Sequence, residues 1–173
     1  KFRELAGSIL TLAGLLAVLL CAVLLLIAPW TPWIAPGFAQ EKKYMVLLNL
    51  YYLVPMAVIF LPYHAVGSFL RARRRFQAFY VGECIIAAFA LIAIFLRRDL
   101  PYIIPISMSL AYMAAFLYVL VVARHEIHLN TDLRGKNIRR IVRMMFHLLP
   151  LYLGNYLFVL VDSAFASYLS TGA

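Results

Sequence analysis

Five long apolar stretches, separated by short charged segments, fill most of this chain. Each reaches or exceeds the roughly 20 residues that a helix needs to cross a hydrocarbon core of about 30 Å. Most of them lack the polar face that a surface helix of a soluble protein carries. A bilayer favours helices, because every backbone polar group must find its partner within the segment. The pattern therefore predicts an all-α membrane protein with transmembrane helices at residues 6–29, 44–70, 76–96, 100–123 and 144–169.

The composition agrees with a membrane protein. Hydrophobic residues make up 65% of the 173 residues, and the mean hydropathy is +0.91. Both values exceed those of ordinary soluble domains. The formal net charge is +9, but the charges lie at the ends of the apolar stretches. Anionic lipid head groups, rather than nucleic acid, are therefore the expected partners. Cys21 and Cys84 fall in different helices and show no disulfide or metal-binding spacing.

The basic residues also orient the predicted helices. Twelve of the sixteen Lys and Arg residues fall on one side of the membrane, which makes that side cytoplasmic by the positive-inside rule. The N-terminus is then inside, and five crossings place the C-terminus outside. Trp30 and Trp33 lie at the outer end of the first helix, as an aromatic belt requires. The twelve residues are Lys1, Arg3, Arg71, Arg73, Arg74, Arg75, Arg124, Arg134, Lys136, Arg139, Arg140 and Arg143.

Proline and small residues predict how the helices bend and pack. Pro55 and Pro62 share one face of the second helix and favour kinks. Carbonyls freed by such kinks can face a transport cavity, although proline is also simply tolerated in membrane helices. In the fourth helix Ser107, Ala111 and Ala115 recur every four residues, a stripe that favours close helix contact. The third helix offers a similar small-residue face at residues 78 and 82.

Glu83 lies inside the third predicted helix, about 10 Å from its start at 1.5 Å per residue. A carboxylate at that depth is costly unless it is paired, hydrated or protonated. We expect it either to face a cavity or to reach back toward the neighbouring arginines. These are Arg71, Arg73, Arg74 and Arg75, which follow the second helix. The arginine run is typical of a helix end that contacts anionic lipid, and a phosphate-bearing substrate is the alternative partner.

Two segments follow the fourth helix. Residues 124–143 are polar, and their second half is basic and amphipathic, which predicts a helix lying in the inner interface. We interpret this segment as a linker between residues 1–123 and residues 144–173. In the fifth helix Asn155 and Asp162 are seven residues apart and share a face. An intramembrane acid such as Asp162 indicates a cation or proton site, and a structural hydrogen bond to another helix is the alternative.

Several short islands of sequence resemble one known family. The outer turn reads Ile34-Ala35-Pro36-Gly37-Phe38, the second helix ends in the stretch 67–76 (GSFLRARRRF), and the fifth runs from Leu148-Leu149-Pro150 to the stretch 161–172 (VDSAFASYLSTG). Together they resemble the lipid II flippases of the MurJ/MviN type, within the multidrug/oligosaccharidyl-lipid/polysaccharide exporter superfamily. The resemblance covers essentially the whole chain, but only as separate islands.

The resemblance implies a bundle of fourteen helices in two lobes of six plus a C-terminal pair, of which this chain resembles helices three to seven. Residues 1–123 would then supply four helices of the N-terminal lobe, and residues 144–173 the first helix of the C-terminal lobe. Such proteins move an undecaprenyl-linked peptidoglycan precursor across the bacterial cytoplasmic (inner) membrane by alternating access. Asp162 is similar to an acid that contributes to a sodium site in some members. The family's substrate-binding arginines lie on helices that this chain does not contain.

The expected function is therefore transport of lipid II rather than catalysis, with membrane lipids, the undecaprenyl-linked glycan and the remainder of the transporter chain as partners. The sequence shows no Gly-rich phosphate loop, clustered metal ligands or Ser–His–Asp set, and sodium is the one cofactor to consider. Lys1 is not a Met and Ala173 closely follows a helix, so we expect an internal piece of a longer protein. The alternatives are an exporter of another lipid-linked polysaccharide unit or drug, and a non-transporting membrane scaffold.

Overall fold

The structure, a computed structural model, describes residues 2–30, 39–96, 100, 102–125, 127, 135, 138–144 and 161. Within these ranges the chain is helical and contains no strand. Helix α1 (Phe2–Ile27) continues into a short 3-10 turn, η1 (Ala28–Trp30), and is followed by three further long helices. These are α3 (Gln40–Ala72), α4 (Phe76–Leu96) and α5 (Ile103–Ala123).

Four of the predicted transmembrane helices are confirmed, because four described helices are long and apolar enough to cross a membrane. The predicted bounds of α4 are those observed, whereas α3 has 33 residues, more than the stretch of 44–70 predicts. At 1.5 Å per residue α3 is about 50 Å long, so it must tilt or extend beyond the hydrocarbon core. Apart from residues 144 and 161, the predicted fifth helix lies outside the described residues.

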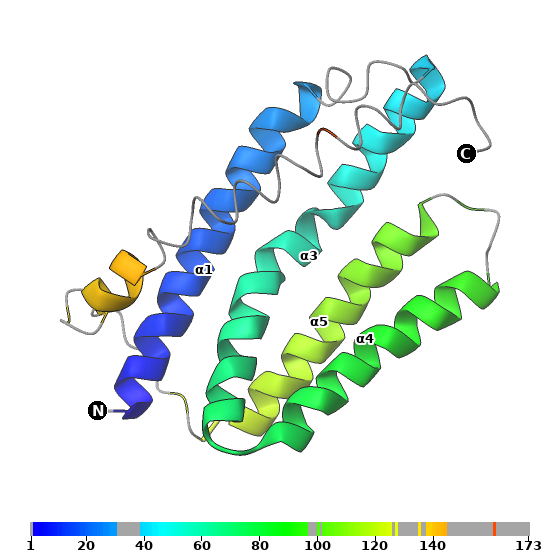
Figure 1. Cartoon of the computed structure of the whole chain (residues 1–173). Helices are drawn as coiled ribbons and strands as arrows, with labels where there is room; N and C mark the ends of the chain where they lie inside the picture. The colour runs from blue at the N-terminus through cyan, green and yellow to red at the C-terminus, as the bar shows by residue number, and fades with distance from the viewer. Residues whose placement is uncertain are drawn as a thin grey trace.

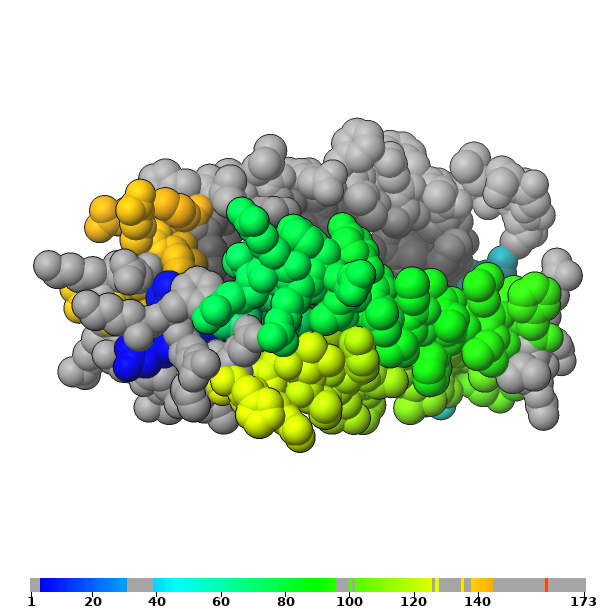
Figure 2. Space-filling model, turned by 90° about the horizontal axis from the view of Figure 1, so that it is seen from below, coloured from blue at the N-terminus to red at the C-terminus, as the bar shows by residue number. Residues whose placement is uncertain are grey.

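The four helices run alternately up and down, and α5 lies between α3 and α4 (Figure 1). α5 packs against both α3 and α4, and α1 packs on the other side of α3. In the space-filling view from below, α4 and α5 lie against one another along their length (Figure 2). The spatial order is therefore α1, α3, α5, α4, which differs from the order along the chain because α5 returns between α3 and α4.

The predicted small-residue stripe on α5 is confirmed as its packing face. Every fourth residue along this face is almost completely buried, and most are small enough to let neighbouring helices approach closely. The first of them also makes a polar contact, because the Ser107 hydroxyl donates a hydrogen bond of 2.8 Å to the Phe89 carbonyl on α4. The buried stripe comprises Ser107, Ala111, Ala115, Val119 and Ala123.

α3 runs unbroken through both of its prolines and bends near its middle (Figure 1). Carbonyls beside Pro55 find partners on neighbouring helices. The Ser109 hydroxyl donates to the Tyr52 carbonyl at 2.6 Å, and the Cys21 thiol lies 3.9 Å from the Val54 carbonyl. Hydroxyl groups on adjacent helices are a usual means of satisfying the backbone near a membrane proline. These contacts favour tolerated proline over a broken helix that opens toward a cavity.

α3 and α4 meet next to the turn that joins them and then diverge around α5 (Figure 1). Two glycines permit this close contact. A Cβ atom on Gly67 would collide with the buried ring of Phe79, and a Cβ atom on Gly82 would lie 2.8 Å from the Tyr63 hydroxyl oxygen. Each glycine thus accommodates an aromatic side chain of the opposite helix, which confirms residue 82 as part of a close-packing face.

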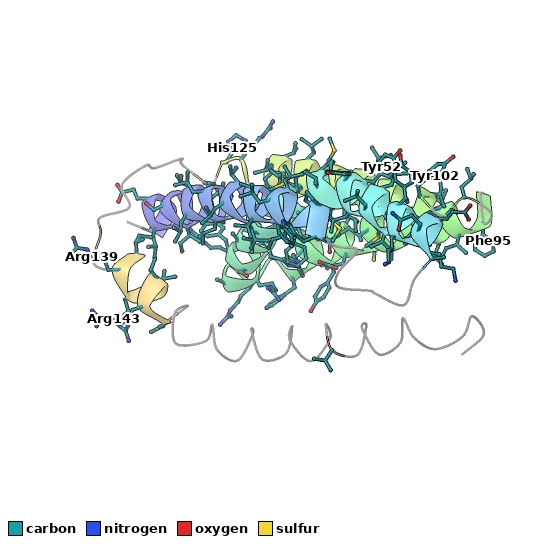
Figure 3. The ribbon with its side chains drawn as sticks, turned by 90° about the horizontal axis from the view of Figure 1, so that it is seen from above. Tyr52, Phe95, Tyr102, His125, Arg139 and Arg143 are labelled. Carbon is teal, nitrogen blue, oxygen red and sulfur yellow. The ribbon has the colours of Figure 1, made fainter. Side chains whose placement is uncertain are left out.

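The predicted amphipathic helix of the polar segment is confirmed at residues 138–144. Ile138 is buried and Ile141 packs toward α1 and α3, whereas the arginines are exposed. Figure 3 shows Arg139 and Arg143 pointing away from the bundle. Such a helix suits the membrane interface, with its apolar side on the bundle and its basic side toward lipid head groups.

The glycine–aromatic contact makes a direct prediction about stability. Gly67→Ala should lower the stability of the protein that contains this chain by about 1–3 kcal/mol, because the added methyl group overpacks the Phe79 ring. Gly14→Ala is the matched control, since nothing lies within 4 Å of its added Cβ and alanine is the better helix former by about 1 kcal/mol. Thermal unfolding in detergent measures both. Equal unfolding midpoints for the two variants would contradict the contact.

Candidate functional site

The carboxylate of Glu83 is tied to the neighbouring helix. The Tyr63 hydroxyl on α3 donates a hydrogen bond of 3.0 Å to Oε1 of Glu83 on α4. Tyr63 is completely buried, and Glu83 is half-buried. Gly82 makes room for the hydroxyl beside the carboxylate. A hydrogen bond to a charged group contributes roughly 1.5–3 kcal/mol, so this pair links α3 to α4 within the membrane-spanning region.

Aromatic rings surround the pair. Tyr63 stacks on Phe79 with ring centroids 5.8 Å apart and meets Tyr112 of α5 edge-on at 5.7 Å. His64 packs edge-on against Phe60 at 4.4 Å. The half-buried ring of His64 belongs to this aromatic cluster, because residues 60 and 79 contact it from α3 and α4.

Arg71 lies near this cluster but is engaged elsewhere. Its guanidinium donates a hydrogen bond of 3.1 Å to the Ser68 hydroxyl and lies over the Phe79 ring, 4.6 Å from its centroid. The sequence left open whether Glu83 faces a cavity or reaches the arginine run. The structure gives the carboxylate a tyrosine donor and gives Arg71 a serine acceptor, so the two charges are near neighbours with separate partners.

The arginine run forms the tight turn between α3 and α4. The Arg75 N–H donates to the Leu70 carbonyl and the Arg74 N–H to the Arg71 carbonyl, each at 2.9 Å. This is the double hydrogen bond of a Schellman helix end, whose left-handed position usually holds glycine. Here Arg74 occupies it with φ 59°. An arginine where glycine is favoured is uncommon and points to a use for its side chain.

All four arginines of the turn are exposed. Arg74 and Arg75 line a shallow depression together with Gln77 of α4 and Val122 at the end of α5. The arrangement concentrates positive charge at the end of the bundle that the charge count assigns to the cytoplasm. It can attract phosphate groups of lipids or of a lipid-linked substrate.

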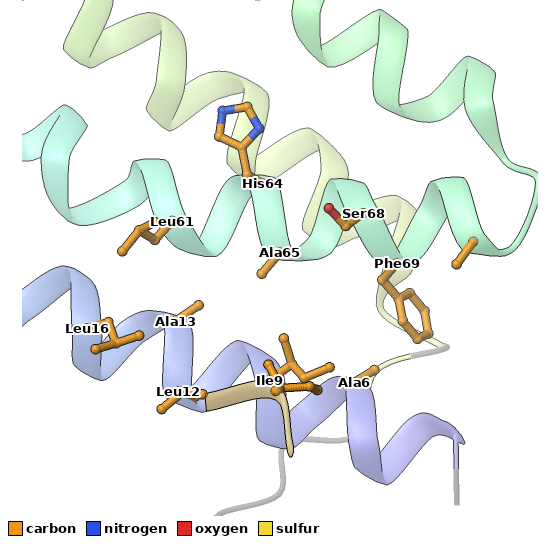
Figure 4. A pocket seen from close by; sticks show the side chains of 12 residues that line it. Ala6, Ile9, Leu12, Ala13, Leu16, Leu61, His64, Ala65, Ser68 and Phe69 are labelled. Carbon is orange, nitrogen blue, oxygen red and sulfur yellow. The ribbon is translucent and has the colours of Figure 1, made fainter. Parts of the chain in front are cut away.

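An apolar groove of about 440 Å³ lies between α1 and α3 on the other side of α3 (Figure 4). Its polar lining is limited to His64 and Ser68, and Figure 4 shows the His64 ring directed away from α1. The groove therefore suits an aliphatic chain or apolar side chains rather than a charged head group. It is lined by Ala6, Ile9, Leu12, Ala13, Leu16, Leu61, His64, Ala65, Ser68, Phe69, Ala72 and Ile141.

The predicted cation site at Asp162 and Asn155 lies outside the described residues, so its geometry and its fit to sodium stay predictions. Within the described ranges, no three His, Cys, Asp or Glu side chains are grouped as metal ligands would be. Tyr63 is a site residue that the sequence reading missed. Counting from Arg74, it lies eleven residues before the turn and Glu83 lies nine after it. In an antiparallel helix pair, two residues that lie a similar number of residues from the connecting turn lie at similar positions along the two helix axes.

Comparison with known proteins agrees with this architecture. The model of the family described as lipid II flippase MurJ matches residues 1–173, the whole chain. No curated protein and no solved structure matches the chain, so the family model alone carries the assignment. The four apolar spans and the basic inner turn are what a multi-pass transporter of the bacterial inner membrane requires. The chain belongs to the MurJ lipid II flippase family.

Proposed function

We propose that the protein containing this chain translocates lipid II, an undecaprenyl-linked peptidoglycan precursor, across the cytoplasmic membrane by alternating access. The observation that carries the proposal is the family match along all 173 residues. The described helices support it, because four of them are long and apolar enough to cross a membrane and arginines gather at one end of the bundle. The chain contributes helices three to seven of the family fold.

The physical problem explains the architecture. A large anionic head group can cross the hydrocarbon core of the membrane only along a hydrated path that carries positive charge. Two helix bundles that rock about such a path can provide it. In this proposal residues 1–123 belong to the first bundle and residues 144–173 open the second. The basic segment 124–143 connects them on the cytoplasmic side, and its helix at 138–144 anchors the connection at the inner interface.

Two groups of residues have proposed roles in transport. The turn formed by Arg71, Arg73, Arg74 and Arg75 attracts the phosphates of inner-leaflet lipid or of the substrate before it enters the path. Asp162, with Asn155 on the same helix face, binds the coupling cation, for which sodium is the candidate. An acid inside a membrane span favours such a role because its charge is costly there without a partner.

The function is tested by reconstitution. The longest reading frame that contains these 173 residues should move fluorescent lipid II from the inner to the outer leaflet of liposomes, where a membrane-impermeant quencher detects it. We expect the quencher to reach about half of the lipid that was initially protected, because flipping lets the two leaflets exchange lipid. Protein-free vesicles should show no such quenching. A polyprenyl-linked glycan without peptide and a cationic dye serve as competing cargoes. Exchange of either cargo in preference to lipid II would favour an exporter of other substrates, and exchange of none would favour a scaffold.

A substitution at Arg74 can separate the proposed phosphate-binding role of the arginine turn from the contribution of the turn to stability. Arg74→Gly removes one charge and also relieves the backbone strain of an arginine in the left-handed conformation. It should therefore stabilise the protein by about 1 kcal/mol. The same variant should bind anionic lipid about fivefold more weakly, because one basic residue contributes about 1 kcal/mol near a charged surface. Arg74→Lys is the control and should keep most of the binding. Titration with anionic lipid and thermal unfolding give the two readouts, and unchanged lipid binding in Arg74→Gly would exclude the phosphate role.

Asp162 is tested by Asp162→Asn, which keeps the size of the side chain and removes its charge. The variant should lose sodium-dependent flipping, with a rate reduced about tenfold or more, because the site would no longer neutralise a bound cation. Asp132→Asn, in the polar segment 124–143, is the control and should flip at the parent rate. Flipping measured with and without a sodium gradient decides the question. Unchanged rate and unchanged sodium dependence in Asp162→Asn would remove this residue from the mechanism.

A further inference from the structure

The apolar groove between α1 and α3 lies in the half of the bundle that the charge count assigns to the cytoplasm, and arginines flank its cytoplasmic end. We propose that this groove binds one acyl chain of an anionic phospholipid from the inner leaflet, and that arginines at the cytoplasmic end hold the lipid phosphate. Such a lipid stays with the bundle and is not the transported cargo, so the inference does not depend on the proposed function.

The groove has the length of one leaflet. Its walls run from residue 6 to residue 16 on α1 and from residue 61 to residue 72 on α3. At 1.5 Å per residue each wall is about 15 Å long, which is half of a hydrocarbon core of about 30 Å. An acyl chain that enters from the inner leaflet therefore matches the groove. The undecaprenyl chain of lipid II is longer than one leaflet and would extend beyond it.

The lining of the groove accepts an aliphatic chain but does not choose between lipids. Figure 4 shows Ala13 of α1 and Ala65 of α3 directed into the space between the two helices, where their small side chains leave room. Lipid tails are as apolar as leucine side chains, so an acyl chain gains little by moving from the bilayer into such a groove. Preference for one kind of lipid must therefore come from contacts with its head group.

Two arginines at the end of α3 contact side chains that line the groove. The Arg73 guanidinium lies 6.0 Å from the centroid of the Phe69 ring, and Arg71 donates a hydrogen bond of 3.1 Å to the Ser68 hydroxyl. Residues 68 and 69 both belong to the lining. These contacts hold the two guanidinium groups beside the cytoplasmic end of the groove, and both arginines are exposed. The planar fork of arginine suits phosphate, because it can donate two parallel hydrogen bonds.

The helix at residues 138–144 adds positive charge at the same end. Its Ile141 lines the groove, and the neighbouring Arg140 is exposed. Glu4 is the acid in the first turn of α1, so the arginines outnumber the acid among the described residues at this end. The charge is complementary to an anionic head group, and each basic residue near a charged membrane surface is worth about fivefold in binding. A phospholipid in the groove would contact α1, α3 and this helix together.

Photocrosslinking at two neighbouring positions of α1 tests the site in the complete protein. Leu16 lines the groove, whereas Leu15 is 55% exposed and serves as the control. The protein is placed in vesicles with equal amounts of phosphatidylglycerol and phosphatidylcholine, and mass spectrometry identifies the crosslinked lipid. Benzoylphenylalanine in place of Leu16 should crosslink to phosphatidylglycerol about fivefold or more in preference to phosphatidylcholine. In place of Leu15 it should crosslink to both lipids equally. Equal crosslinking of the two lipids at position 16 would overturn the proposal.

The same readout tests the head-group contact and the other possible occupants. Arg73→Gln should lower the preference at position 16 about fivefold, and Arg73→Lys should keep most of it. An unchanged preference in Arg73→Gln would remove this arginine from the site. When lipid II is added to the vesicles, crosslinking to it in preference to phosphatidylglycerol would overturn the proposal, as would crosslinking to another segment of the protein in place of lipid. If the protein moves no lipid II but position 16 still selects phosphatidylglycerol, the proposed function fails and the lipid site stands.

Discussion

The structure depends on one constraint: within the membrane no water is at hand to bond a polar group that the helices leave unpaired. The described bundle meets this constraint by joining neighbouring helices through single polar contacts. Ser107 donates to α4 and Ser109 donates to α3 near a proline, both from α5. Tyr63 does the same for Glu83 between α3 and α4. Each contact satisfies a group that would otherwise be costly and at the same time fixes which helices are neighbours.

Much of this fold could be predicted from the sequence because its signals are local. Apolar length identified the four described spans, and the recurrence of Ser107, Ala111 and Ala115 identified the packing face of α5. The amphipathic pattern placed a helix at residues 138–144. Bounds were less well predicted where polar residues extend a helix, as at Gln40, where α3 begins before the apolar stretch. The apolar pattern marks the part of a helix that crosses the hydrocarbon core, and the helix itself continues beyond that part.

The candidate site could be predicted only in part, because its geometry depends on contacts between helices. The cost of placing a carboxylate inside a membrane helix singled out Glu83. The sequence did not reveal that the hydroxyl of Tyr63, twenty residues earlier, donates a hydrogen bond to it. That pairing requires the Schellman turn at Arg74, which sets how α3 and α4 align, and the two glycines that let them approach. The family assignment follows from the whole-chain match.

The distribution of polar contacts bears on how the bundle can move. α3, α4 and α5 are interlocked by hydroxyl–carbonyl and hydroxyl–carboxylate bonds, and bonds of this kind resist sliding because a lost partner is not replaced in oil. α1 meets α3 across a largely apolar groove, and the weak contact between the Cys21 thiol and the Val54 carbonyl is less of an obstacle to readjustment than a hydroxyl bond. A rearrangement of the bundle should therefore keep α3, α4 and α5 together.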